Sequence, residues 1–249
     1  MAEFAPLPQP LNAKGDPRLV GVEIELGGLP EGEVARLCAE AVGGTIKQVD
    51  SHTWHVEDSR IGRLEVYLDI FLRKAQKSKL RDLALDLGRE VVPVEIVSEP
   101  LDMEGLARLD ALRAVLREAG ALGSGAGWFF GFGLHLNIEI ASGKDADIVR
   151  PLLAYALIED WLRTGARCRA PALGKARIGV EGLTTEFVRA LIKAGPGATR
   201  DEVTALYLEH TPSRNRGLDM LPILAQFEPE RIAAAISDKT SARPTFHFR

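Results

Sequence analysis

Residues 131–139 read Gly-Phe-Gly-Leu-His-Leu-Asn-Ile-Glu, and this stretch constrains how the neighbouring segments can be arranged. In its second half His135, Asn137 and Glu139 each follow a leucine or an isoleucine. This alternation predicts a β-strand with one apolar and one polar face. The two preceding glycines allow a bend or a close approach of another backbone. A strand face that presents an imidazole, an amide and a carboxylate is a suitable surface for a polar ligand.

Several other segments show the same alternation and are predicted to be strands. They are residues 18–27, 45–50, 53–57, 63–71, 91–98 and 243–249. Helical spacing of apolar residues predicts helices at 31–42, 75–88, 102–119, 146–163, 184–194, 199–209, 218–227 and 229–236. The helices do not alternate strictly with the strands, which favours an α+β fold with a largely antiparallel sheet and helices on one side.

The chain is expected to form one domain over residues 18–249, preceded by a frayed arm at residues 1–17. Residues 163–217 contain a basic loop and short helices, and are expected to form an insertion or a lid. Arg18 begins the first strand of the domain.

The composition excludes some function classes. With 249 residues and a net charge of −4, the chain lacks the basic field that holds a nucleic-acid partner. No apolar run approaches the ~18 residues that span a bilayer. Two cysteines, Cys38 and Cys168, give no disulfide framework or metal motif, and the N-terminus lacks a secretory signal. A cytoplasmic protein without a membrane or nucleic-acid partner is expected.

Acidic and imidazole side chains recur on the polar faces of the predicted strands. They are Glu23, Glu25, Glu95, Glu99, His135 and His247, joined by Asn137. Crowded carboxylates repel one another, so they need protons or cations, and hard oxygen ligands suit Mg²⁺ or Mn²⁺. The alternative is that each strand has a solvated outer face, as is usual in antiparallel sheets.

Four arginines could complete such a site by neutralising phosphate. They are Arg214, Arg216, Arg243 and Arg249. For Arg214 and Arg216 the alternative is a solvated loop. Other site types are poorly supported: residues 123–127 are glycine-rich but lack the Lys-Ser/Thr of a P-loop, and no HExxH, GxSxG or CxxC motif is present.

Four segments in order resemble the amidoligases, a branch of the carboxylate–amine ligases that includes glutamine synthetase and glutamate–cysteine ligase. They are residues 21–25 (GVEIE), 94–100 (VEIVSEP), 133–137 (GLHLN) and 243–249 (RPTFHFR). Residues 54–58 are similar to the strand and turn that precede the second segment in the family. The resemblance implies a curved, mostly antiparallel, glutamine-synthetase-like sheet that forms a cleft for ATP and divalent ions, with helices on its other face.

The resemblance also implies roles for individual residues. Metal would be held by Glu23, Glu25, His135 and His247, with Glu95 and Glu99 matching the acidic strand of the family. The last segment departs from the family pattern, because His247 stands where that pattern usually has glutamate. Two imidazoles make a softer ligand set, for which Mn²⁺ or another transition ion would compete with Mg²⁺. The alternative is that one metal site is lost, and activity with it.

The function implied is an ATP-dependent carboxylate–amine ligase that forms an amide or peptide-type bond through an acyl phosphate. Its substrates would be a carboxylate and an amine, either small molecules or peptides. Arg243, Arg249 and Arg214 would stabilise transferred charge, and Glu25, Asn137 and Arg216 would bind the nucleotide. The alternatives are a guanidino-type phosphotransferase on the same fold and an inactive homologue that binds a nucleotide or peptide. The sequence leaves the oligomeric state open.

Overall fold

The computed structural model describes residues 4–68, 93–123, 133–164, 180–237 and 240–249. The predicted helix at 75–88, the outer ends of the strands at 63–71 and 91–98, and most of the predicted basic loop lie outside the described residues. The chain divides into two compact units. Unit 1 comprises Met1–Pro6 and Leu19–His135, and unit 2 comprises Leu7–Arg18 and Leu136–Arg249.

The described strands are hydrogen-bonded in the order β2-β3-β4-β5-β1-β6-β8-β7. Their bounds are Val20–Leu26 (β1), Thr45–Gln48 (β2), Thr53–Glu57 (β3), Leu64–Leu68 (β4), Val94–Ser98 (β5), Leu134–Glu139 (β6), Leu218–Asp219 (β7) and Thr245–Phe248 (β8). The pairings that the described residues define are antiparallel. This confirms the predicted α+β fold with an antiparallel sheet. The opening stretch becomes β6, which begins in unit 1 and continues into unit 2.

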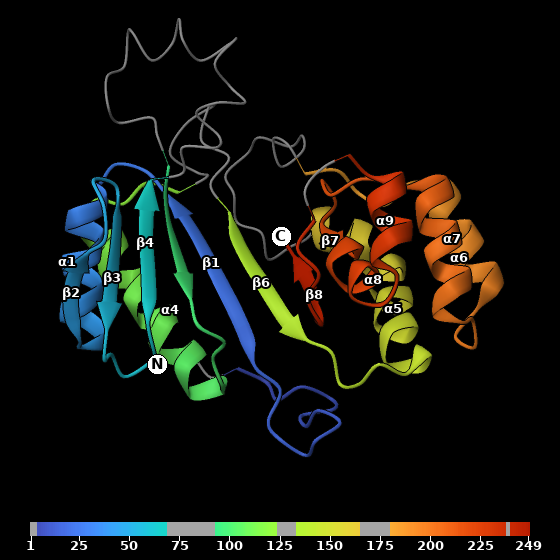
Figure 1. The fold of residues 1–249 in the computed structure, drawn as a ribbon, viewed down its shortest axis with the longest axis horizontal. Helices are drawn as coiled ribbons and strands as arrows, with labels where there is room; N and C mark the ends of the chain where they lie inside the picture. Colours follow the sequence, from blue (N-terminus) through green and yellow to red (C-terminus); the bar gives the residue numbers. More distant parts are fainter. Residues whose placement is uncertain (1–3, 69–92, 124–132, 165–179, 238–239) are drawn as a thin grey trace, which may run out of the picture. The chain divides into compact units, whose positions relative to one another are not determined.

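In unit 1 the alternation of β1 separates its two faces. Val22, Ile24 and Leu26 are buried, whereas the intervening Glu23 and Glu25 are half-buried. Helix α1 (Glu31–Val42) packs against β3, β4 and the other helix of this unit, α4 (Met103–Glu118). Figure 1 shows both helices behind the strands of this unit. The apolar residues of the strands therefore form the core, and the acidic residues occupy the opposite face.

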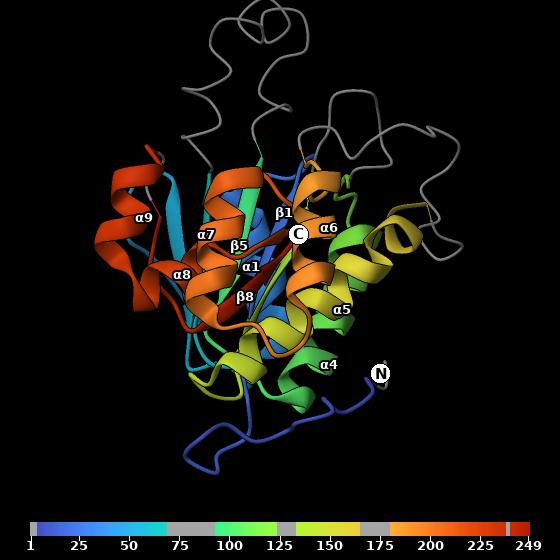
Figure 2. The same cartoon turned by 90° about the vertical axis from the view of Figure 1, so that its right-hand side faces the viewer.

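Unit 2 carries the helices α5 (Asp145–Thr164), α6 (Thr185–Ala194), α7 (Arg200–His210), α8 (Leu221–Phe227) and α9 (Pro229–Ala235). Figure 2 shows these helices after a 90° turn of the view in Figure 1. Phe187 and Tyr207 are fully buried and meet edge to face, with ring centroids 5.4 Å apart. They share one apolar cluster with Ile148, Leu152 and the inner face of β8.

Side chains cap helices α4 and α7 at the first residues of the predicted segments 102–119 and 199–209. Asp102 accepts a hydrogen bond from the Gly105 backbone N–H at 2.8 Å and starts α4. Thr199 and Glu202 form a reciprocal capping box at the start of α7. These short-range bonds satisfy orphan N–H groups of the first turn, so they can be predicted from local sequence alone.

Two local predictions were wrong. The predicted helix at 218–227 begins only at Leu221, because Pro222 favours the first helical turn and the preceding residues pair with β8. The helical spacing of apolar residues in 146–163 also predicts that Leu157 and Trp161 lie on the inner face of α5, but each is 62% exposed. The inward stripe instead runs through Leu152 and Ala156 and ends on the buried Glu159, which the apolar pattern does not mark.

The longest described helix, α5, spans 20 residues but carries charged side chains along its length. Within the described residues, none of the helices combines the length and the apolar character that crossing a membrane requires.

Candidate functional site

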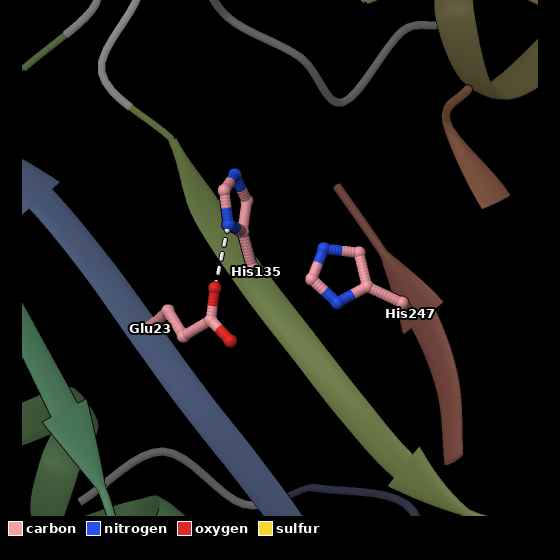
Figure 3. Close-up of side chains that lie close together, drawn as sticks. All are labelled: Glu23, His135 and His247. Carbon is pink, nitrogen blue, oxygen red and sulfur yellow. Dashed lines mark hydrogen bonds and ion pairs between the residues drawn. The ribbon is translucent and has the colours of Figure 1, made fainter. Parts of the chain in front are cut away.

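Unit 1 brings Glu23 of β1 and His135 of β6 into direct contact. His135 Nδ1 lies 3.0 Å from Glu23 Oε2, and each side chain is 14% exposed (Figure 3). A carboxylate can only accept, so this contact assigns the proton to Nδ1 and leaves a lone pair on Nε2. The pair thus offers the two atom types, an imidazole nitrogen and a carboxylate oxygen, that transition ions bind.

Gly133 keeps the space beside this pair open. Its N–H donates to Glu25 Oε2 at 3.0 Å, and its carbonyl accepts from the Glu25 backbone N–H at 2.9 Å. A Cβ atom at this position would lie 2.9 Å from His135 Nε2 and 3.3 Å from Glu25 Oε2. Because a Cβ here would crowd both side chains, glycine leaves room beside the two proposed ligand atoms. The backbone bonds also fix the position of the Glu25 carboxylate.

A row of polar residues crosses unit 1 on the face of the strands that carries Glu23. Glu25 stands directly opposite Glu95 of β5, which stands opposite Tyr67 of β4. The Tyr67 hydroxyl donates to Glu95 Oε2 at 2.7 Å. Facing carboxylates on neighbouring strands repel each other, and a phenol hydrogen bond offsets only part of that cost. A cation between the Glu25 and Glu95 carboxylates would reduce this repulsion.

Glu99 has different surroundings from the other predicted ligands. It follows the end of β5, its side chain is 50% exposed, and its Oε2 accepts from the Arg63 backbone N–H at 3.1 Å. These contacts stabilise the turn before β4. Glu99 therefore has a structural role in this turn, in addition to the metal-binding role expected of it.

Unit 2 holds a separate row of buried polar residues. His247 of β8 stands opposite Asn137 of β6, and His247 Nδ1 lies 2.8 Å from Asn137 Oδ1. On its other side His247 stands opposite Asp219 of β7. His247, Asn137 and Asp219 are 5%, 6% and 0% exposed, respectively. This face of the strands is therefore polar and buried from solvent.

The four predicted arginines have distinct environments in unit 2. Arg214 Nε lies 3.6 Å from Asp219 Oδ2, and a third of its side chain is exposed. Arg216 is 9% exposed, donates to the Gly182 carbonyl at 2.6 Å and pairs with Glu181 at 3.1 Å. Arg249 follows β8, and its backbone N–H donates to the Gly217 carbonyl at 2.9 Å. Arg243 is exposed. Arg214 is thus partly exposed, whereas Arg216 is buried against its own loop.

The sequence reasoning missed two polar residues of these rows and a third polar residue that is buried in α5. Tyr67 was treated only as part of an alternating strand, and Asp219 was assigned to a helix. Glu159 lies inside α5, where it accepts from the Tyr155 hydroxyl at 3.0 Å and from the Leu183 N–H at 2.8 Å. A signal existed for Asp219, because it is a lone acid among Leu218, Met220 and Leu221. Charged residues in such a setting are rarely buried without a partner.

The Asp219 carboxyl is expected to make stability depend on pH. Burial raises its pKa to about 6, against the lowering effects of the Leu221 N–H, Arg214 and Arg249. Between about pH 4 and 6 the native state therefore keeps a proton that the unfolded chain has lost. Stability from this group should fall as pH rises through that window, by up to about 3 kcal/mol, and level off above it.

The measurement is denaturant unfolding of the wild type and Asp219→Asn from pH 4 to 7, with a chelator present. The free-energy difference between the two proteins isolates this carboxyl from other titrating groups. A difference that stays constant, or that moves in favour of the wild type as pH rises, would contradict a raised pKa.

Comparison with known proteins gives one finding that covers most of the chain. Residues 16–249 match the family described as “putative amidoligase enzyme”. No curated protein and no solved structure matches the chain. The family match extends through β1, β6 and β8, which carry the polar residues described above. The chain therefore belongs to the amidoligase family.

Proposed function

We propose that this protein is an ATP-dependent carboxylate–amine ligase that forms an amide bond through an acyl phosphate. Membership of the amidoligase family indicates a ligase. The observation that carries the finer proposal is the contact between Glu23 and His135, beside the Glu25 carboxylate and the open space at Gly133. This arrangement fits a divalent ion, which would in turn bind the phosphates of a nucleoside triphosphate.

The donor set decides which ion is suitable. Glu23 and Glu25 offer carboxylate oxygens, and His135 offers an imidazole nitrogen. We propose that Glu95 supports the acidic face of unit 1. Mixed oxygen and nitrogen donors suit Mn²⁺ better than Mg²⁺, which prefers oxygen. When bound, the ion would neutralise phosphate oxygens of ATP.

The residues of the chain would then position the reactants. In the first step a substrate carboxylate oxygen attacks the γ-phosphorus of ATP, and the bond to the bridging oxygen breaks to release ADP. In the second step an amine attacks the acyl carbon, loses a proton, and phosphate leaves. Arg214, Arg243 and Arg249 would bind the transferred phosphoryl oxygens, while Asn137 and Arg216 would contact the nucleotide. Neither step needs a side-chain nucleophile.

His247 supports one alternative function. The imidazole replaces a glutamate of the family pattern and is held by Asn137 in a nearly dry environment. A protein that binds nucleotide without turning it over would tolerate this change. His247→Glu separates the two functions, because the change would restore ATP turnover only to a homologue inactivated at this position.

The direct test is calorimetric titration of ATP into the protein with Mg²⁺, with Mn²⁺ and with a chelator. Binding is expected only with a divalent ion, and Glu25→Ala should weaken it by about tenfold or more. Glu33→Gln is a matched control, because Glu33 lies exposed on α1 in an ion pair with Arg36. Absence of ATP binding under all three conditions would contradict the proposed function.

A further inference from the structure

Asp219 is a fully buried carboxylate that the proposed chemistry does not use. It lies on the two-residue strand β7, between Leu218 and Met220, and is 0% exposed. Burial of an ionised carboxylate costs several kcal/mol unless hydrogen bonds and opposite charges compensate. The contacts of Asp219 therefore indicate what this carboxylate does.

One oxygen of Asp219 has a structural contact. Oδ1 accepts from the Leu221 backbone N–H at 3.0 Å, at the start of α8. A neutral asparagine could make the same bond through its side-chain oxygen. The hydrogen bond thus accounts for the shape of residue 219 and leaves its charge to be explained.

The charge faces arginines. Oδ2 of Asp219 lies 3.6 Å from Arg214 Nε, and Arg249, at the end of β8, attracts the same carboxylate. Arg214 lies in the loop before β7, whereas Arg249 approaches across the β7–β8 pairing. Asp219 thus attracts two cations that come from different elements.

The neighbouring Arg216 shows that this anchoring is selective. Arg216 is in the same loop, but its guanidinium is bound by Glu181 and the Gly182 carbonyl and is nearly buried. Arg214 Nε instead lies 3.6 Å from Asp219 Oδ2, at ion-pair distance, and a third of the Arg214 side chain reaches solvent. A partly exposed guanidinium beside a buried carboxylate can contact an anion that approaches from solvent.

We propose that Asp219 is a positioning residue that orients Arg214, with Arg249 beside it, to bind a phosphate group of the nucleotide. The inference rests on the proposed function, since the anion is a phosphate of ATP. It assigns to the Asp219 charge a role in affinity that a purely structural carboxylate would not have.

The test compares three substitutions at residue 219. Asp219→Asn keeps the shape and the bond to Leu221 but removes the charge, Asp219→Leu removes both, and Asp219→Glu keeps the charge. Binding of ATP with Mn²⁺, and of inorganic tripolyphosphate alone, is measured by calorimetry. We expect a loss of about tenfold with Asn and Leu, and a smaller loss with Glu. Thermal unfolding shows that each variant folds, with Leu at least as stable as Asn.

A double-mutant cycle with Arg214→Gln tests the positioning role. If Asp219 acts through Arg214, then Asp219→Asn should cost little in the Arg214→Gln background. Additive losses, or an Asp219→Asn protein with unchanged affinity, would overturn the inference. A wild type that binds tripolyphosphate but shows no metal-dependent ATP binding would contradict the proposed function alone. A wild type that binds neither would overturn both.

Discussion

Glu23→Gln is expected to weaken Mn²⁺ binding by about 10–100-fold, the loss typical of removing a carboxylate in contact with a metal-binding histidine. The carboxylate accepts from His135 Nδ1 at 3.0 Å, and both side chains are 14% exposed. The substitution removes a negative charge beside the ion. It also weakens the hydrogen bond that fixes the imidazole tautomer. Both effects lower affinity, whether Glu23 binds the ion itself or only orients His135.

Mn²⁺ affinity can be measured by calorimetry or by the electron paramagnetic resonance signal of the free ion. Glu33→Gln, at an exposed position of α1 in the same unit, should leave affinity unchanged. Unfolding free energy should fall by about 1–3 kcal/mol, since both side chains are largely buried and the hydrogen bond to a charged group is weakened. A Glu23→Gln protein that binds Mn²⁺ as tightly as the wild type would exclude this pair from the metal site.

Gly133→Ala is the second substitution with a large expected effect, although it adds only one methyl group. The new Cβ would lie 2.9 Å from His135 Nε2, closer than real Cβ contacts, and 3.3 Å from Glu25 Oε2. The imidazole must then rotate away from Glu23, or the methyl group blocks its lone pair. Either outcome disturbs two proposed ligands at once, so we expect Mn²⁺ affinity to fall by about tenfold or more.

Gly123→Ala is the matched control for Gly133→Ala. Gly123 also belongs to unit 1, and a Cβ at that position would meet nothing within 4 Å. The control should bind Mn²⁺ like the wild type. Equal affinities of the Gly133→Ala and Gly123→Ala proteins would show that the space beside His135 is not used by a ligand. Circular dichroism of both variants verifies that the fold is retained.

Local sequence determined most of the elements of this protein. Period-two alternation placed β1 and β6, and the predicted helices at 102–119 and 199–209 begin at the residues that cap α4 and α7. These signals are reliable because alternation reports burial of one strand face and caps satisfy N–H groups within a few residues. The helical spacing of apolar residues failed at Leu157 of α5, where apolar residues fall on more than one stripe of the helix.

Sequence order and family motifs also indicated which residues belong to the candidate site, but not how they contact one another. That Glu23 meets His135, and that Glu25 faces Glu95, depends on strand register between segments far apart in the chain. A shift of one residue in register would send each side chain to the opposite face, and no local pattern fixes that choice.

The position of Asp219 on a strand came from the tertiary structure alone. Its sequence neighbours are apolar, so local rules assigned it to a helix, whereas pairing with β8 makes it a strand residue opposite His247. Its negative charge is attracted to Arg214 and Arg249, which come from a preceding loop and from the end of the chain. The sequence thus determined most of the strands and helices and the chemical types of the site residues. Long-range pairing decided their partners, because the free energy of a buried charge depends on what the fold places beside it.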